Sequence, residues 1–129
     1  IMEAIKSTHN QRQVISNVTL WEEDGIVNFY FEEDTVIDAD LVIQMFDDFS
    51  EVNCMKNKST LLNLEGISGA TLEGLSLLNQ KLENFSNHKA ILVNDEKTEI
   101  IGRVMANSFS HNKPTKVFKS ALKADAWMN

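Results

Sequence analysis

The spacing of the hydrophobic residues changes along this chain, and the change limits its fold more than any other feature. Between Val14 and Phe31, apolar and polar residues alternate on both sides of Asp24-Gly25. This pattern is typical of two antiparallel strands joined by a tight turn. From Asp38 onward, segments with helical spacing alternate with short apolar runs. The chain is therefore expected to open with a β-hairpin and to continue as an α/β domain.

Four helices and three further strands are expected after the hairpin. Helical spacing covers residues 38–52, 72–85, 100–109 and 120–127, and the strands are expected at 61–64, 90–93 and 115–118. Asp38 and Ser120 are suited to cap the first and last helix, and Ile100 falls on the apolar stripe of the third. The order β-β-α-β-α-β-α-β-α predicts an α/β fold. Its mixed sheet has about five strands, accompanied by about four helices and joined in its later part by right-handed crossovers.

Length and composition favour a single compact unit. The 129 residues fit one domain, and a hydrophobic share of 43% is enough for one core. Residues 1–12 form a polar segment, and the domain is expected at 13–129. No secretory signal precedes it, and no apolar run approaches the roughly 18 residues of a membrane span. A cytoplasmic protein is therefore expected.

Charge and reactive residues argue against several function classes. The net charge of −7 disfavours nucleic-acid binding, which depends on attraction to phosphates. Cys54 is the single cysteine, so no internal disulfide or thiolate metal site is expected. His9, His88 and His111 are scattered along the chain, and none has a metal ligand at the usual spacing. No cofactor, metal or catalytic motif is indicated, and the sequence favours a protein that is not an enzyme.

The C-terminal part carries a more particular motif. Lys113–Phe118, followed by Ala121, Ala124 and Trp127, is similar to the ending of bacterial STAS-like proteins of uncharacterised function. In those proteins a Pro-Thr-x-x-Phe strand leads into a final helix that bears Ala and Trp. Together with the element order, this motif resembles the STAS domain, the fold of the anti-sigma-factor antagonists. The resemblance extends from Val14 to Trp127 and implies a SpoIIAA-like fold.

The resemblance also indicates a switch segment. In the antagonists a strand reading Leu-Asp-Leu is followed by a loop and by Asp-Ser-Ser-Gly-Leu, whose second Ser is phosphorylated by a partner kinase. Here the matching stretch is Leu62-Asn63-Leu64, a loop at 65–70, and Thr71-Leu72-Glu73-Gly74-Leu75. Glu73 replaces the phosphorylated Ser and would supply a permanent negative charge. The alternative for Thr71 is a plain helix cap, and for Glu73 a charge that favours the helix dipole.

The resemblance implies a non-enzymatic regulatory domain that docks a protein partner through the loop and helix start at 65–76. A regulatory kinase or an anti-sigma factor is the kind of partner implied, and the oligomeric state, monomer or homodimer, stays open. The predicted docking and switch residues are Ser68, Gly69, Thr71, Glu73, Gly74 and Ser76. Gly66 and Gly69 also offer backbone N–H groups to an anion, but Glu65 and Glu73 would repel it.

A second function remains open on the same fold. A carrier or sensor of a small hydrophobic ligand would hold it between the sheet and the first and third helices. The adaptable side chains available for such a lining are Met45, Phe46, Phe49, Met105 and Phe109. The simpler interpretation of these side chains is that they pack in the core.

Overall fold

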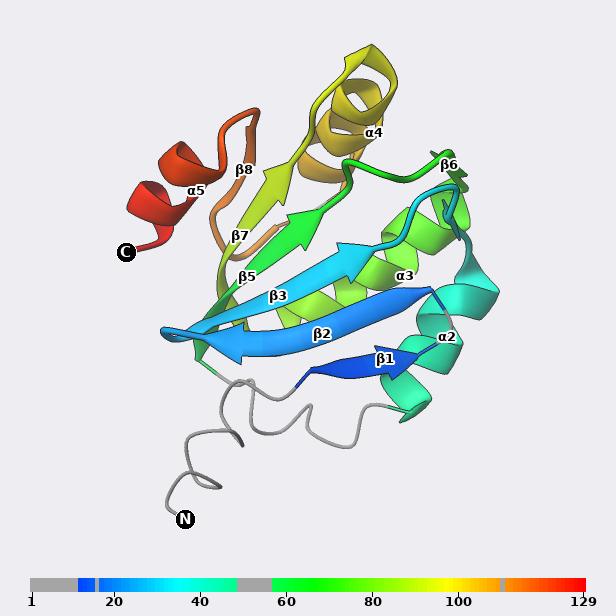
Figure 1. Cartoon of the computed structure of the whole chain (residues 1–129), viewed down its shortest axis with the longest axis horizontal. Coiled ribbons are helices and arrows are strands. Elements are labelled where there is room, and N and C mark those ends of the chain that lie inside the picture. Colours follow the sequence, from blue (N-terminus) through cyan, green and yellow to red (C-terminus); the bar gives the residue numbers. More distant parts are fainter. Residues whose placement is uncertain (1–11, 16, 49–56, 110) are drawn as a thin grey trace.

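The computed structural model describes residues 12–15, 17–48, 57–109 and 111–129. Within these residues, the centre of the domain is a six-stranded mixed sheet (Figure 1). From one edge to the other, its strands are β1 (Gln13–Ile15), β2 (Val18–Glu23), β3 (Ile26–Phe31), β5 (Lys58–Asn63), β7 (Ser86–Leu92) and β8 (Thr115–Phe118). The first three strands pair antiparallel, and β3, β5, β7 and β8 pair parallel. The predicted α/β class with a mixed sheet is confirmed.

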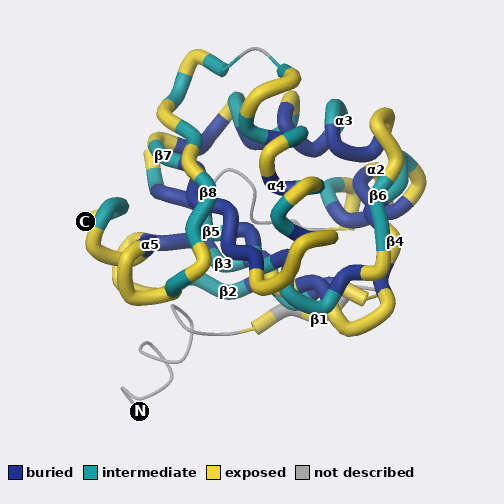
Figure 2. The backbone as a smooth tube through the Cα atoms, turned by 90° about the horizontal axis from the view of Figure 1, so that it is seen from above, coloured by how far each residue is buried: buried dark blue, intermediate teal, exposed yellow. Residues whose placement is uncertain are grey.

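Helices lie on both faces of the sheet, but unequally (Figures 1 and 2). One face is covered by α2 (Ala39–Asp48), α3 (Leu72–Glu83) and α4 (Glu96–Asn107), and α5 (Ala121–Met128) lies on the other. Both predicted caps form: the Leu41 amide donates to the Asp38 carboxylate over 2.9 Å, and the Lys123 amide donates to the Ser120 hydroxyl over 3.3 Å. A small separate sheet pairs β4 (Val36–Ile37) with β6 (Gly69–Ala70) beside the starts of α2 and α3.

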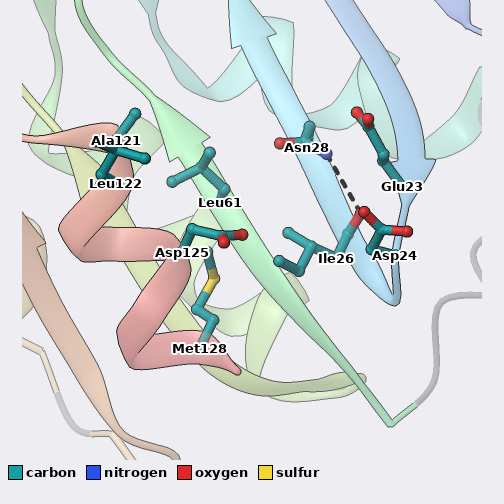
Figure 3. A pocket seen from close by; sticks show the side chains of 9 residues that line it. All are labelled: Glu23, Asp24, Ile26, Asn28, Leu61, Ala121, Leu122, Asp125 and Met128. Atoms are coloured by element: carbon teal, nitrogen blue, oxygen red, sulfur yellow. Dashed lines mark hydrogen bonds between the residues drawn. The ribbon is translucent and has the colours of Figure 1, made fainter.

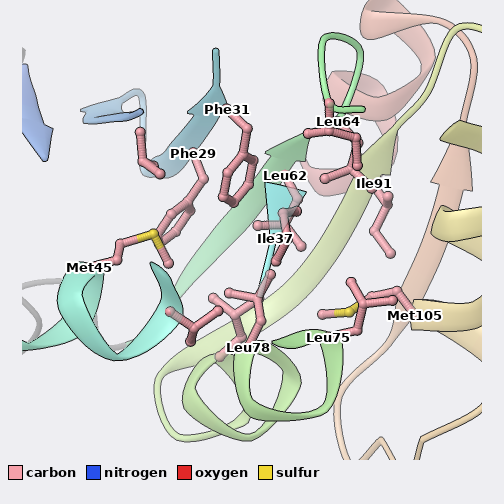
Figure 4. Close-up of a cluster of buried hydrophobic side chains, with 14 of the residues drawn as sticks. Phe29, Phe31, Ile37, Met45, Leu62, Leu64, Leu75, Leu78, Ile91 and Met105 are labelled. Carbon is pink, nitrogen blue, oxygen red and sulfur yellow. The ribbon is translucent and has the colours of Figure 1, made fainter. Parts of the chain in front are cut away.

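The strand register divides the sheet into an inner and an outer face. Leu20, Phe29, Leu62 and Ile91 are aligned across four strands and are buried in the core with α2, α3 and α4 (Figure 4). The next row, which points to the opposite face, consists of Trp21, Asn28, Leu61 and Ala90. The apolar run at 61–64 is typical of a strand covered on both faces. Leu61 is only half-buried, so this strand is fully covered on the inner face alone.

The opening segment differs from the prediction. Residues 14–21 read as one strand, but β1 turns back onto β2, with Val14 aligned to Thr19, so the sheet has six strands rather than five. Alternation with a period of two continues on both sides of a tight turn, and for that reason it does not reveal the turn. The predicted turn at Asp24-Gly25 does form, and both residues adopt positive φ values, 53° and 80°, as a two-residue hairpin turn requires.

One residue of the predicted stripe of the third helix lies outside the core, whereas Ile101, Val104, Met105 and Phe109 of that stripe are buried or pack against it. Ile100 is 58% exposed, whereas Thr98, Gly102 and Met105 are buried. A Cβ atom on Gly102 would lie 3.0 Å from a methyl group of Val93, so the glycine lets α4 lie close against the sheet. This close contact sets the face that α4 buries and leaves Ile100 outside. The predicted end of the first helix, at 49–52, lies outside the described residues.

Candidate functional site

The predicted docking segment is held in place by main-chain hydrogen bonds. The Ser68 amide donates to the Thr35 carbonyl over 2.8 Å, and the Thr71 amide donates to the Ile37 carbonyl over 2.9 Å. Gly69 lies in β6, where it pairs with Val36. These three contacts involve only the backbone, so they do not depend on the side chains that the loop exposes.

Two hydroxyl groups of the segment are exposed and also hydrogen-bonded. The Thr71 hydroxyl accepts from the Gly74 amide over 3.0 Å and caps α3, as the simpler interpretation of this residue predicts. The Ser68 hydroxyl lies 3.2 Å from the Asp34 carbonyl, to which it donates. Both groups therefore help to hold the loop, and both face solvent.

Gly74 has a different role from its neighbours, because it is buried where α3 begins. A Cβ atom there would lie 2.5 Å from the Ile37 carbonyl oxygen and 2.7 Å from the Asp38 Cα, distances that real side chains do not show. Glycine thus allows the starts of α2 and α3 to touch. Gly74 positions the exposed residues Thr71 and Glu73 and is not itself accessible to a partner.

An open groove, called here the α3 groove, runs beside this helix start. It is lined by Ala39, Leu72, Glu73, Ser76, Leu77, Gln80 and Phe109. Leu72, the first residue of α3, is 65% exposed, and this helix position does not require an apolar side chain. Among the described residues that line the groove, Glu73 is the one charged side chain. The groove therefore joins two predicted docking residues, Glu73 and Ser76, to Phe109 from the predicted ligand lining.

The other residues of the predicted ligand lining are placed in or against the core. Met45 and Met105 are fully buried in the hydrophobic cluster (Figure 4). The ring of Phe46 packs against those of Phe29 and Phe85, with 6.1 Å between centroids in each pair. Phe49 lies outside the described residues. The carrier function stays a prediction, and these side chains pack as core residues do.

A buried polar cluster that the sequence pattern did not indicate lies between α3 and β7. The Lys89 residue is only 1% exposed, and its ammonium group meets three acceptors. These are Asn79 Oδ1 at 3.0 Å, His111 Nδ1 at 2.9 Å and the Glu83 carboxylate. Burial lowers the pKa of Lys89 below its usual value, although the hydrogen bond to Glu83 opposes this shift. Three ammonium protons thus meet three acceptors inside the protein.

Hydrogen bonding also determines the state of the other two ionisable groups. His111 Nε2 lies 3.0 Å from the Met105 carbonyl, which can only accept, so Nε2 carries the proton and Nδ1 accepts from Lys89. Burial by itself would raise the pKa of Glu83, but hydrogen bonds from Lys89 and from the Asn112 amide outweigh it and lower this pKa. The cluster is therefore a buried ion pair with hydrogen-bonded neighbours, and it links α3 to β7 and to the segment after α4.

One feature of the sequence could have indicated this cluster. Asn79 falls on the apolar stripe of α3, four residues after Leu75 and three before Leu82, and it is buried there. A polar residue in such a place needs an internal partner.

In the described part of the chain, no three His, Cys, Asp or Glu side chains gather as metal ligands. None of the helices described combines the length and the apolar character that crossing a bilayer requires.

Comparison with known proteins supports the fold. Residues 20–129 match the family described as Domain of unknown function (DUF7793). Among solved structures, the chain is similar to an uncharacterised protein of the DUF3478 family from Shewanella loihica PV-4, described as having a SpoIIAA-like fold. The two are 18% identical with a TM-score of 0.62, over 93% of this chain and 97% of that one. The predicted SpoIIAA-like fold is thereby confirmed. No curated protein matches the chain.

Proposed function

This chain belongs to the DUF7793 family, and we propose that it is a non-catalytic protein-interaction domain that docks a partner through the α3 groove. The observation that carries this proposal is Leu72, which is 65% exposed at the rim of a mainly apolar groove. Exposed apolar surface next to a fixed loop is typical of interaction sites. Backbone hydrogen bonds and the Gly74 contact hold the groove in one shape, which lowers the entropy lost on binding.

The charge at this site indicates what a partner would present. Glu73 is exposed and lies in the first turn of α3. A partner that fits would place an apolar side chain against Leu72 and Phe109 and a hydrogen-bond donor or a cation at Glu73. By resemblance to the STAS antagonists, a regulatory kinase or an anti-sigma factor is the kind of partner we infer. Because Glu73 cannot be phosphorylated, its charge would be a constant feature of the surface rather than a switch.

The experiment compares two variants that each remove one exposed apolar side chain. Leu72→Ser alters the α3 groove, and Ile43→Ser is the matched control, since Ile43 is 46% exposed on α2 and does not line the groove. The wild type and both variants are used to capture partners from the source organism. The partner so identified is then purified and titrated against each form.

The expected result is a partner bound equally by the wild type and Ile43→Ser, and at least tenfold more weakly by Leu72→Ser. Glu73→Lys should weaken the same complex. Circular dichroism and thermal melting check that all the variants fold. Equal affinity of this partner for the wild type and Leu72→Ser would overturn the proposal.

A further inference from the structure

The outer face of the sheet is covered over only part of its width. Trp127 holds α5 above β7 and β8, with its ring centroid 5.2 Å from that of His88 and 5.5 Å from that of Phe118. Ala124, a residue of the same helix, is fully buried. In the part of the chain that the structure describes, no helix lies over β2 and β3 on this face (Figures 1 and 2). Parallel pairs such as β3 and β5 are normally covered on both faces, whereas an antiparallel pair such as β2 and β3 can leave one face to solvent.

A groove of about 310 Å³, called here the sheet-face groove, lies in the uncovered region next to α5 (Figure 3). Its lining residues are Glu23, Asp24, Ile26, Asn28, Leu61, Ala121, Leu122, Asp125 and Met128. Strands β3 and β5 supply the floor, α5 forms one wall, and the β2–β3 turn forms the other. Leu122, on the wall, is 83% exposed, more than any other large apolar side chain in the described residues.

The charged side chains that line the groove all have one sign, and outside it the Arg12 guanidinium lies over the Trp21 ring, 4.1 Å from the centroid. Its charged lining residues are Glu23, Asp24 and Asp125, and within the described residues no cation forms an ion pair with any of them. Glu23 accepts a hydrogen bond from the neutral Trp21 indole at 3.3 Å, and Asp125 accepts one from the Asn129 amide at 3.2 Å. A partner with negative charge, such as a nucleic acid or an anionic membrane, would be repelled. A cationic partner with an apolar side fits both properties of the groove.

The width of the uncovered region suits a helix. The distance from β5 to β2 is two strand spacings, about 10 Å. Packed helices lie about 8–10 Å apart, so one further helix fits on the sheet next to α5. Such a helix would cover Leu61 and Leu122 with its apolar side, and its flanks would face the carboxylates of the turn and of Asp125.

We propose that the sheet-face groove binds a cationic amphipathic helix of a partner protein. The partner helix lies next to α5 and completes the outer helix layer. Its Lys or Arg side chains pair with Glu23, Asp24 and Asp125. This surface is on the opposite side of the sheet from the α3 groove, so it does not depend on the function proposed above.

The test uses a synthetic 18-residue helical peptide with Leu at helical spacing and Lys at the remaining positions. The same peptide with Glu in place of Lys is the control ligand. Both are titrated into the isotopically labelled full chain, and amide shifts are followed by NMR. The Lys peptide is expected to shift amides of β3 and α5, and the Glu peptide is expected to leave them unchanged.

Matched variants distinguish the groove from general attraction to an acidic protein. Leu122→Ser and Asp125→Lys are each expected to weaken binding of the Lys peptide about tenfold. Ile43→Ser and Asp47→Lys make matched changes at exposed sites outside both grooves, and should change affinity less than twofold.

Three outcomes would overturn the proposal. The first is a Lys peptide that does not shift the amides of β3 and α5. The second is an equal loss of affinity in the control variants Ile43→Ser and Asp47→Lys. The third is a wild-type dimer, seen by light scattering, that Leu122→Ser converts to a monomer, because a second copy of the chain would then be the occupant.

Discussion

Replacing Lys89 by methionine is expected to destabilise the domain by about 3–5 kcal/mol, the usual cost of removing one member of a buried ion pair. The two side chains are unbranched and similar in length, so the change affects charge far more than packing. In the variant, Glu83 has a side chain only 13% exposed, loses its ion-pair partner and keeps the Asn112 amide as a donor. Asn79 and His111 each lose the Lys89 ammonium as a donor.

The structure gives this magnitude in a second way. Hydrogen bonds to charged groups contribute about 1.5–3 kcal/mol each, and neutral acceptors that lose a donor inside the protein cost about 1 kcal/mol or more. The Lys89 ammonium serves one carboxylate and two neutral acceptors. Taking the lower figure for the two neutral acceptors, the summed loss is about 3.5–5 kcal/mol. Because natural domains are stable by only about 5–15 kcal/mol, the variant should be close to unfolding.

A double variant makes the reasoning testable even if Lys89→Met folds poorly. Glu83→Gln added to Lys89→Met removes the unpaired charge, and the new amide can donate to a neighbouring acceptor. We expect the double variant to recover at least half of the lost stability, as measured by urea unfolding at pH 7 with circular dichroism. A Lys89→Met variant within about 1 kcal/mol of the wild type would refute this account. A double variant less stable than Lys89→Met alone would do the same.

Three further changes should have smaller effects. Gly74→Ala is expected to lower stability by about 1–3 kcal/mol, because the new methyl group would lie 2.5 Å from the main-chain oxygen of Ile37; an unchanged melting temperature would contradict this close contact. Thr71→Ala should cost about 1 kcal/mol in urea unfolding by removing the cap of α3, and Thr71→Ser should restore it. The folded pKa of Glu83 is lowered from 4.5, so its ionisation stabilises the fold above that pH, and this contribution is lost as pH falls through the lower folded value. Glu83→Gln should therefore lose stability less steeply than the wild type on acidification below pH 4.5, and parallel profiles would show that the carboxylate is not involved.

Local features of the fold could be predicted because neighbouring residues determine them. Asp38, Thr71 and Ser120 each cap a helix through an amide three residues later, so sequence alone identifies them. Strand alternation likewise places Leu62 on the inner face. The exposure of Ile100 could not be predicted, since it follows from how closely Gly102 approaches β7, a distance that a helical stripe does not encode.

The sites depend on contacts between distant residues and were less predictable. The sequence indicates the loop and the start of α3, but Phe109 comes to the α3 groove because α4 ends at Asn107, before the predicted end. Lys89 contacts residues 6, 10 and 22 positions away in the sequence, and only the folded topology brings these together. Which part of the outer sheet face stays open depends on where Trp127 anchors α5, which no periodicity specifies.

The order of the strands in the large sheet follows the order in which the ribosome makes them. Each strand from β1 to β8 in this sheet has its predecessor as a neighbour, and none is inserted between two strands already paired. A nascent chain can therefore extend the sheet from one edge as synthesis proceeds, without opening hydrogen bonds formed earlier. Among the described strands, β8 is made after the other five and pairs with β7 alone, so it can join a sheet that is already formed. Translation and assembly can thus advance in the same direction throughout.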